Sequence, residues 1–273
     1  MTMRIDGTMP KQPVRRTVLV TGALGGIGRA VCESFADQGH SIVAHDIHQP
    51  ESEPAQGFMK ELENRGAPKA SYYRADLRCV EEIDAMFDDI IEDNTCIDIL
   101  VNNAGIQKTA PIESFDYNTW SDILATNLTA VYRSIQCAVP GMRKGGWGRI
   151  VNISSVHGLV GSKDKAAYVA AKHGVVGLTK VISLETAGQG VTVNSICPGW
   201  TDTPILEPQI TGRMEKLNSS REEAVFDLVV EKQPTGKLVS PRQVASLVEY
   251  LASDLAENIT GTAVPIDGGW TCQ

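Results

Sequence analysis

The feature that most constrains the fold is a regular alternation of short apolar segments with longer segments of helical period. Seven of the short segments are rich in β-branched residues, and we expect each to be a strand. They are Thr17–Val20, Ser41–His45, Ser71–Arg74, Ile97–Asn102, Arg149–Ser154, Val191–Ile196 and Ala263–Ile266. Strands that are separated by helices form a parallel sheet with helices on both faces. The sequence therefore predicts an α/β fold with a doubly wound, seven-stranded parallel sheet.

The spacing of these segments predicts one domain. A chain of 273 residues is long enough for a single sizeable core. We place the domain at residues 14–273, after a loose extension at 1–13 that has no apolar run of the signal-peptide kind. Residues 203–238 interrupt the alternation, because they are polar, rich in proline and only partly periodic. We expect them to form a small helical lid; a surface insertion is the alternative.

Composition excludes several classes of protein. The formal net charge is -8, and the lysines and arginines are scattered, so no basic surface for nucleic acid is expected. The six cysteines lie far apart, without the density of a disulfide framework or the pairing of a zinc site. No apolar stretch is long enough for a membrane span. We expect a cytoplasmic protein with no nucleic-acid or membrane partner and no catalytic metal.

A glycine-rich segment after the first predicted strand indicates a dinucleotide site. Residues 21–28 read Thr-Gly-Ala-Leu-Gly-Gly-Ile-Gly and lead into a predicted helix at 29–38. Glycines permit a tight turn there and let backbone N–H groups approach a pyrophosphate at the positive end of the helix. Asp46 follows the second strand, where a carboxylate can accept hydrogen bonds from the adenosine ribose and repel a 2′-phosphate. The pattern favours NAD over NADP; a solvated loop carboxylate is the alternative for Asp46.

Polar residues after two further strands fit the same ligand. Asp76 and Leu77 follow the third strand, where Asp76 can bond the adenine amino group. Residues 102–105, Asn-Asn-Ala-Gly, follow the fourth strand and can line the adenosine side or brace the sheet. The full set expected to bind the cofactor, including residues of the catalytic and lid segments, is Thr21, Gly22, Leu24, Gly26, Ile27, Gly28, Asp46, Asp76, Leu77, Asn103, Ala104, Gly105, Tyr168, Lys172, Pro198, Gly199 and Thr203.

Ser155, Tyr168 and Lys172 form the candidate catalytic group. Tyr168 and Lys172 are four residues apart, so on a helix they share a face. A free tyrosine, with a pKa of about 10, is a poor base near neutrality, but a nearby lysine and a nicotinamide cation both favour its phenolate. Tyr168 can then accept the proton of an alcohol. Ser155, at the exit of the fifth strand, can hydrogen-bond the substrate oxygen and stabilise its developing charge.

Four motifs, taken in this order, resemble the short-chain dehydrogenase/reductase family over nearly the whole chain. They are the glycine-rich turn 21–28, the Asn-Asn-Ala-Gly segment 102–105, Ser155 and Tyr168-x-x-x-Lys172. The resemblance implies a Rossmann-type fold, hydride transfer between a nicotinamide cofactor and a substrate carbon, and a homotetramer. It also implies that Asn127 joins the catalytic group by holding a water in a proton relay through Lys172.

Segments around the catalytic group resemble more closely the bacterial (R)-3-hydroxybutyrate dehydrogenases of this family. They are residues 105–107, 110–113, 156–163, 167–180, 197–200 and 231–234. This resemblance implies an NAD-dependent interconversion of (R)-3-hydroxybutyrate and acetoacetate, a reaction of ketone body metabolism. It also implies that Gln107, His157, Lys165 and a lid glutamine, Gln209, hold the substrate carboxylate. The chain departs from the pattern of these enzymes at 201–202 and at Pro208.

A short hydroxy acid needs polar donors close to the reacting carbon, and Lys165 lies one helical turn before Tyr168. A helix-start cation in solvent is the alternative for Lys165, and a packed loop residue is the alternative for His157. Trp200 and Trp270 can form an apolar wall against the alkyl end, or can pack in the core or an interface. The full set expected to bind the substrate is Gln107, Ser155, His157, Lys165, Tyr168, Trp200, Gln209 and Trp270.

Two other functions stay open at this point. The first is a dehydrogenase for another secondary alcohol, such as a sugar alcohol, a hydroxysteroid or a 3-oxoacyl thioester, none of which carries a carboxylate at this distance. The second is an NAD-binding regulator that has kept the fold without the chemistry. The intact group of Ser155, Tyr168, Lys172 and Asn127 argues against the regulator.

Overall fold

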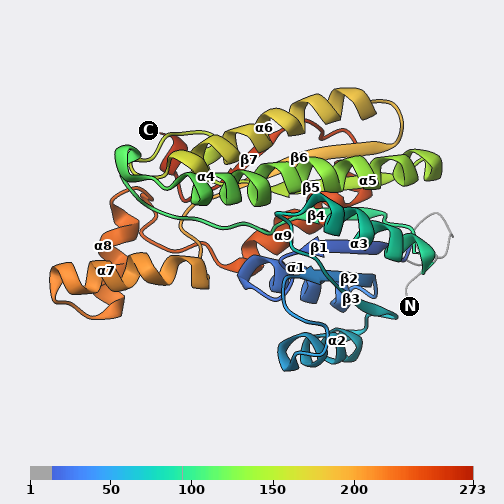
Figure 1. Ribbon diagram of the computed structural model, residues 1–273, viewed down its shortest axis with the longest axis horizontal. Coiled ribbons are helices and arrows are strands. Elements are labelled where there is room, and N and C mark those ends of the chain that lie inside the picture. The colour runs from blue at the N-terminus through green and yellow to red at the C-terminus, as the bar shows by residue number, and fades with distance from the viewer. Residues whose placement is uncertain (1–13, 94, 273) are drawn as a thin grey trace, which may run out of the picture.

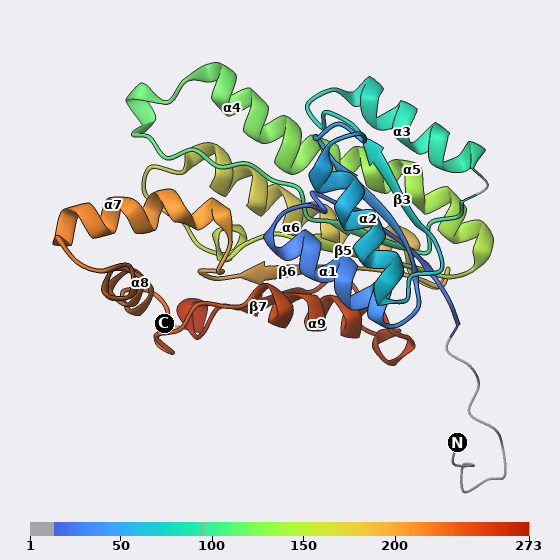
Figure 2. The same cartoon turned by 90° about the horizontal axis from the view of Figure 1, so that it is seen from below.

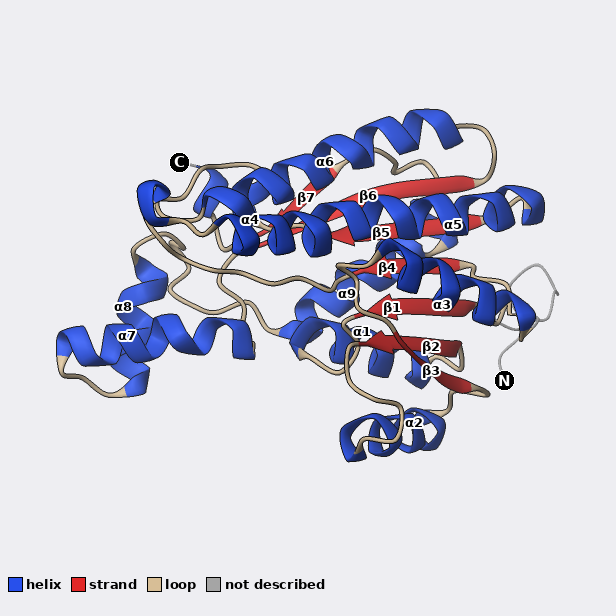
Figure 3. Cartoon of the chain, viewed as in Figure 1, coloured by secondary structure: helices blue, strands red, loops and turns tan. Residues whose placement is uncertain are grey.

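The computed structural model describes residues 14–93 and 95–272, so the predicted extension at 1–13 lies outside the described residues. In the described part of the chain, seven strands form one parallel sheet in the order β3-β2-β1-β4-β5-β6-β7 (Figure 3). The strands are β1 (Thr17–Thr21), β2 (Ser41–Asp46), β3 (Ala70–Arg74), β4 (Ile99–Asn102), β5 (Gly148–Ile153), β6 (Val191–Pro198) and β7 (Ala263–Ile266). The predicted fold is confirmed, and the first and last residues of each predicted strand lie within two residues of those observed.

Helices cover both faces of the sheet (Figures 1 and 2). One core lies under α1 (Gly26–Asp37), α2 (Glu53–Arg65) and α9 (Pro241–Ala252). The other lies under α3 (Val80–Glu92), α5 (Ala130–Gly145) and α6 (Ala166–Thr186). Between β4 and α5, α4 (Tyr117–Leu124) continues through a π-helical turn (Ala125–Thr129). No helix in the described ranges is long and apolar enough to cross a membrane.

The two cores explain why the middle of a central strand such as β1 is an uninterrupted run of apolar residues. Along β1, Val18 and Val20 pack into one core while Leu19 packs into the other, and all three are fully buried. Successive side chains of a strand point to opposite faces, so a sheet covered on both sides needs apolar residues on both. Each such side chain contributes about 1.5–3 kcal/mol of burial free energy.

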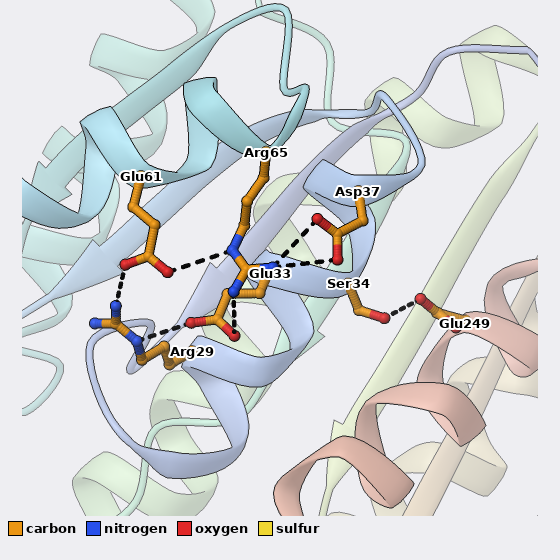
Figure 4. Close-up of polar contacts among 7 residues, drawn as sticks. All are labelled: Arg29, Glu33, Ser34, Asp37, Glu61, Arg65 and Glu249. Atoms are coloured by element: carbon orange, nitrogen blue, oxygen red, sulfur yellow. Dashed lines mark hydrogen bonds and ion pairs between the residues drawn. The ribbon is translucent and has the colours of Figure 1, made fainter.

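A polar network fixes the helix that begins at the glycine-rich turn. Figure 4 shows its members on α1, α2 and α9, namely Arg29, Glu33, Ser34, Asp37, Glu61, Arg65 and Glu249. Arg65 of α2 reaches three carboxylates, two of them on α1, at 3.3–3.4 Å. Arg29 of α1 pairs with Glu33 at 2.9 Å and with Glu61. Because these side chains are partly exposed, each pair contributes little by itself, and the network chiefly sets how α2 lies against α1.

Residues 203–238, predicted to be a helical lid, contain a pair of helices at one end of the molecule (Figure 1). They are α7 (Glu207–Leu217) and α8 (Arg221–Val230), and a capping box formed by Ser220 and Glu223 starts α8. The pair has a small apolar core of its own, which contains Leu206, Ile210 and Leu228. The prolines that obscure the helical period fall in the first turn of α7 and outside α8.

Candidate active site

A cavity of about 630 Å³ lies at the carboxyl ends of the strands and is closed on one side by the lid. The strand order reverses between β1 and β4, and parallel sheets bind ligands at such a point. The predicted site residues that line the cavity are Gly22, Gly26, Ile27, Asp46, Asp76, Leu77, Asn103, Ala104, Gly105, Gln107, Ser155, His157, Lys165, Tyr168, Lys172, Pro198, Gly199, Trp200, Thr203, Gln209 and Trp270. Four predicted site residues lie outside the cavity wall and position residues that belong to it. They are Thr21, Leu24, Gly28 and Asn127.

The glycine-rich turn has the shape that a pyrophosphate requires. A Cβ on Gly28 would lie 2.1 Å from the carbonyl oxygen of Gly22, so only glycine permits the helix to start this close to the strand. No side chain caps the N-terminus of α1 at Gly25, which leaves backbone N–H groups of its first turn for an anion. Behind the turn, the Asn103 side chain donates to the carbonyls of Thr21 and Gly22 at 3.0 and 3.1 Å. The residues present therefore fit a dinucleotide phosphate.

Asp46 is held rigidly in the cavity wall. One carboxylate oxygen accepts a hydrogen bond from Leu24 N at 3.1 Å, and the other accepts from Ile47 N at 2.8 Å. The first bond ties the end of β2 to the glycine-rich turn. A fixed carboxylate at this place suits ribose hydroxyls, which are hydrogen-bond donors.

Asp76 also lines the cavity, but its carboxylate is already engaged. Arg78 donates from Nη2 to one oxygen at 2.6 Å and from Nε to both, at 3.0 and 3.1 Å. These hydrogen bonds lower the pKa of Asp76 to about 2. The predicted contact of Asp76 with an adenine amino group would have to share a carboxylate that Arg78 occupies.

Tyr168 and Lys172 share one face of α6, as their spacing predicted. Lys172 Nζ lies 5.6 Å from the centroid of the Tyr168 ring and donates to the carbonyl of Ile153 at 2.8 Å. Burial lowers the pKa of Lys172 to about 8. Burial also raises the pKa of Tyr168, against the smaller opposite effect of its hydrogen bond with Ser155. The phenol is therefore protonated near neutrality, and a positive charge beside it would favour its ionisation.

Asn127 lies in the π-helical turn and is fully buried. Its side-chain oxygen accepts from Ile106 N and its side-chain nitrogen donates to Ile106 O, both at 2.9 Å. The amide thus braces the segment after β4, directly beside Gly105. A π-helical turn is rare and is often found at functional sites.

Lys165 and His157 stand on the other side of Tyr168, toward the lid. Lys165 Nζ donates to Gln209 Oε1 of α7 at 3.3 Å and lies 4.9 Å above the centroid of the Trp200 ring. Burial lowers the pKa of Lys165 to about 8 and that of His157 to about 4. His157 is therefore neutral at physiological pH, and its Nδ1 is buried without a hydrogen-bond partner. Its contact with an anion would be a hydrogen bond rather than an ion pair.

Two tryptophans complete this part of the wall. The rings of Trp200 and Trp270 are 5.3 Å apart, and Trp270 also meets His157 edge to face at 5.4 Å. The sequence analysis missed several lining residues, among them Arg78, Thr126 and Pro204. Arg78 comes two residues after Asp76, and that proximity was the only available signal.

Comparisons with known proteins identify the family of this chain. The family model described as Enoyl-(Acyl carrier protein) reductase matches residues 22–271. A D-beta-hydroxybutyrate dehydrogenase of Cupriavidus necator is 42% identical over 259 residues, which cover 94% of this chain and 98% of that protein. A protein of the same name from Rhizobium meliloti is 43% identical over 258 residues, which cover 94% and 99%.

The fold has a solved counterpart as well. A structure of actinorhodin polyketide ketoreductase with NADPH is 36% identical, has a TM-score of 0.86, and covers 94% of this chain and 97% of that one. The family model covers most of the chain, and the two relatives are more than 40% identical to it over nearly their whole length. This chain belongs to the short-chain dehydrogenase/reductase family of oxidoreductases.

Proposed function

We propose that this chain is an NAD-dependent dehydrogenase that interconverts (R)-3-hydroxybutyrate and acetoacetate. Lys165 is the observation that carries the proposal. It is only 5% exposed in the cavity wall, and within residues 14–93 and 95–272 no Asp or Glu forms an ion pair with it. A buried ammonium whose partners are a neutral amide and an aromatic ring is unfavourable, and an anionic ligand offsets that cost.

The groups around Lys165 suit a carboxylate. Gln209 is already within hydrogen-bond reach of the ammonium, Gln107 lines the same cavity, and His157 is neutral with an unpartnered ring nitrogen. Trp200 and Trp270 give the short alkyl end an apolar surface. The two relatives of highest identity given above are named for this hydroxy acid, which supports the same substrate.

The positions of the side chains support the following catalytic roles. A bound nicotinamide ring would supply the hydride acceptor and a positive charge. Ser155 donates a hydrogen bond to the substrate oxygen, and Tyr168 accepts the hydroxyl proton during oxidation and returns it during reduction. Lys172 anchors the end of β5 and adds the positive charge that favours the phenolate. The residues of the glycine-rich turn and Asp46 hold the dinucleotide.

Asp46 supports NAD as the cofactor in preference to NADP. Both of its oxygens are fixed by backbone N–H groups, so the carboxylate cannot turn away from a 2′-phosphate. Like charges this close cost several kcal/mol, about a hundredfold or more in affinity. The related ketoreductase was solved with NADPH, so the fold alone does not select NAD, and we expect the choice to depend on such local residues.

The test is reduction of NAD and of NADP, followed by NADH or NADPH absorbance, with (R)- and (S)-3-hydroxybutyrate offered separately. We expect turnover with NAD and the (R) form. Activity only with neutral or bulky alcohols would retain the dehydrogenase and reject the substrate, as for a sugar alcohol or 3-oxoacyl reductase. A folded protein that binds NADH and turns over no alcohol would be the regulator instead.

The assembly is a separate proposal. We propose a homotetramer, supported by family resemblance. Light scattering after size-exclusion chromatography tests it, and a monomeric mass at micromolar concentration would reject it.

A further inference from the structure

Arg78 is a cavity residue to which the reaction assigns no role. It follows β3 and lines the cavity beside Asp76 and Leu77, on the side of Asp46 and away from Tyr168. Its side chain is 47% exposed, yet it is held from two directions. Asp76 receives hydrogen bonds from Nε and Nη2, and Asp122 of α4 receives one from Nη1 at 3.3 Å. Two carboxylates from different elements thus fix one guanidinium.

The geometry of these bonds leaves the flat faces of the guanidinium free. All N–H groups of a guanidinium point outward in its plane, so carboxylates at its edges occupy the donors and leave the faces open. The two carboxylates also cancel its charge. Arg78 is therefore poorly suited to hold a phosphate, but well suited to lie against a planar ring.

The wall next to Arg78 favours such a ring. Leu77 is 8% exposed and Ala75 is 1% exposed, and both line the same part of the cavity. An apolar wall beside a flat cation is a surface on which heteroaromatic rings stack.

We propose that Arg78 binds the cofactor by stacking its guanidinium on the adenine ring, in an orientation set by Asp76 and Asp122. This inference rests on the dinucleotide binding of the proposed function. It gives Asp76 a positioning role through Arg78, and it makes the contact depend on the plane of the side chain rather than on its charge. Arg78→Ala removes both the plane and the charge, whereas Arg78→Lys removes only the plane.

The experiment is isothermal titration calorimetry of AMP, ADP-ribose and nicotinamide mononucleotide with wild type, Arg78→Ala, Arg78→Lys and the control Arg133→Ala. Arg133 is an arginine of α5 that is ion-paired with Asp84 and lies outside the cavity wall. We expect both Arg78 variants to bind AMP and ADP-ribose about two- to thirtyfold more weakly, the range for cation–aromatic contacts, with the mononucleotide unchanged. Thermal unfolding verifies that each variant is folded.

Three outcomes would overturn the inference. Affinity for AMP that is unchanged in Arg78→Ala means that the side chain does not touch the base. Affinity restored by Arg78→Lys means that charge, not stacking, is responsible. Equal losses for the mononucleotide mean that the change has disturbed the whole site. A wild type that binds neither NADH nor ADP-ribose would instead reject the proposed function, so the two failures are distinguishable.

Discussion

Replacement of Lys165 by methionine tests the anionic substrate most directly. Methionine keeps an unbranched side chain against Trp200 and removes the charge. A carboxylate left without its buried partner loses about 3–5 kcal/mol, which is about a hundredfold to a few thousandfold in kcat/KM. The matched control is Lys163→Met, two residues earlier, because Lys163 is exposed and outside the cavity wall. The assay is initial-rate NADH formation with 3-hydroxybutyrate and, for comparison, with neutral 2-butanol.

The expected result is a loss confined to the hydroxy acid. In Lys165→Met, kcat/KM for 3-hydroxybutyrate should fall by the factor above, the value for 2-butanol should stay within about threefold, and NADH should bind normally. Equal losses with both alcohols, or a normal rate with the acid, would refute the role of Lys165 in charge recognition.

The pH dependence of inhibitor binding tests the same ammonium without the chemistry. Burial lowers the pKa of Lys165 from 10.5 to about 8, so the group is a cation below pH 8 and neutral above it. Butyrate, which has the carboxylate and no hydroxyl group, should inhibit with a constant Ki below pH 8. Above that pH its Ki should rise by up to about tenfold per pH unit, because only the cation attracts it. A Ki that is flat to pH 10 contradicts this assignment.

The same pKa shift predicts that the Lys165→Met variant is more stable than the wild type. The pKa of Lys165 is lower in the folded state than in the unfolded state, so protonation disfavours folding. The cost is fully present below pH 8 and disappears as the pH rises toward 10.5. The shift corresponds to about 3 kcal/mol, and we expect Lys165→Met to gain about 1–3 kcal/mol of unfolding free energy at pH 7. Urea denaturation at pH 7 measures it; a loss of stability would contradict the cost inferred from burial.

Three further substitutions test other parts of the site. Tyr168→Phe should lower kcat by about 10²–10⁴-fold while NADH still binds, as measured by fluorescence titration; retained turnover would exclude Tyr168 as the base. Asp46→Ser should raise kcat/KM with NADP relative to NAD by about tenfold or more, and an unchanged ratio would mean that Asp46 does not face the ribose. Gly28→Ala places a Cβ 2.1 Å from Gly22 O, so it should weaken NADH binding and cost about 1–3 kcal/mol of stability in denaturant titrations; near-normal values for both would show that the turn adapts.

The strands and the cofactor turn could be predicted because local chemistry determines them. A strand buried on both faces needs consecutive apolar residues, as in 18–20 of β1 and 99–101 of β4, and this leaves a signal in the sequence. The turn at residues 21–28 needs glycine where a Cβ would collide, as at Gly28. The position of Tyr168 and Lys172 on one face of a helix follows from their spacing of four residues.

Contacts between distant segments left no such signal. Arg78 is oriented by Asp122, which comes 44 residues later in the chain. Asn127 hydrogen-bonds to Ile106 from a π-helical turn, which the α-helical spacing of apolar residues does not predict. The protonation of Tyr168 and His157 depends on how completely each is buried, which spacing does not reveal. The family resemblance predicted that both residues belong to the site, but it did not indicate whether each side chain is protonated.

The π-helical turn between α4 and α5 has a consequence for how this segment tolerates change in length. One extra residue in a helical turn rotates everything beyond it by about 100°. The faces that α4 and α5 bury are therefore out of phase in the sequence, although the two helices run on continuously (Figure 2). Deleting one residue from 125–129 would give a regular helix and at the same time turn one buried face to solvent. The length of this segment therefore cannot change without a loss of packing. The hydrogen bonds between Asn127 and Ile106 require the π-helical turn.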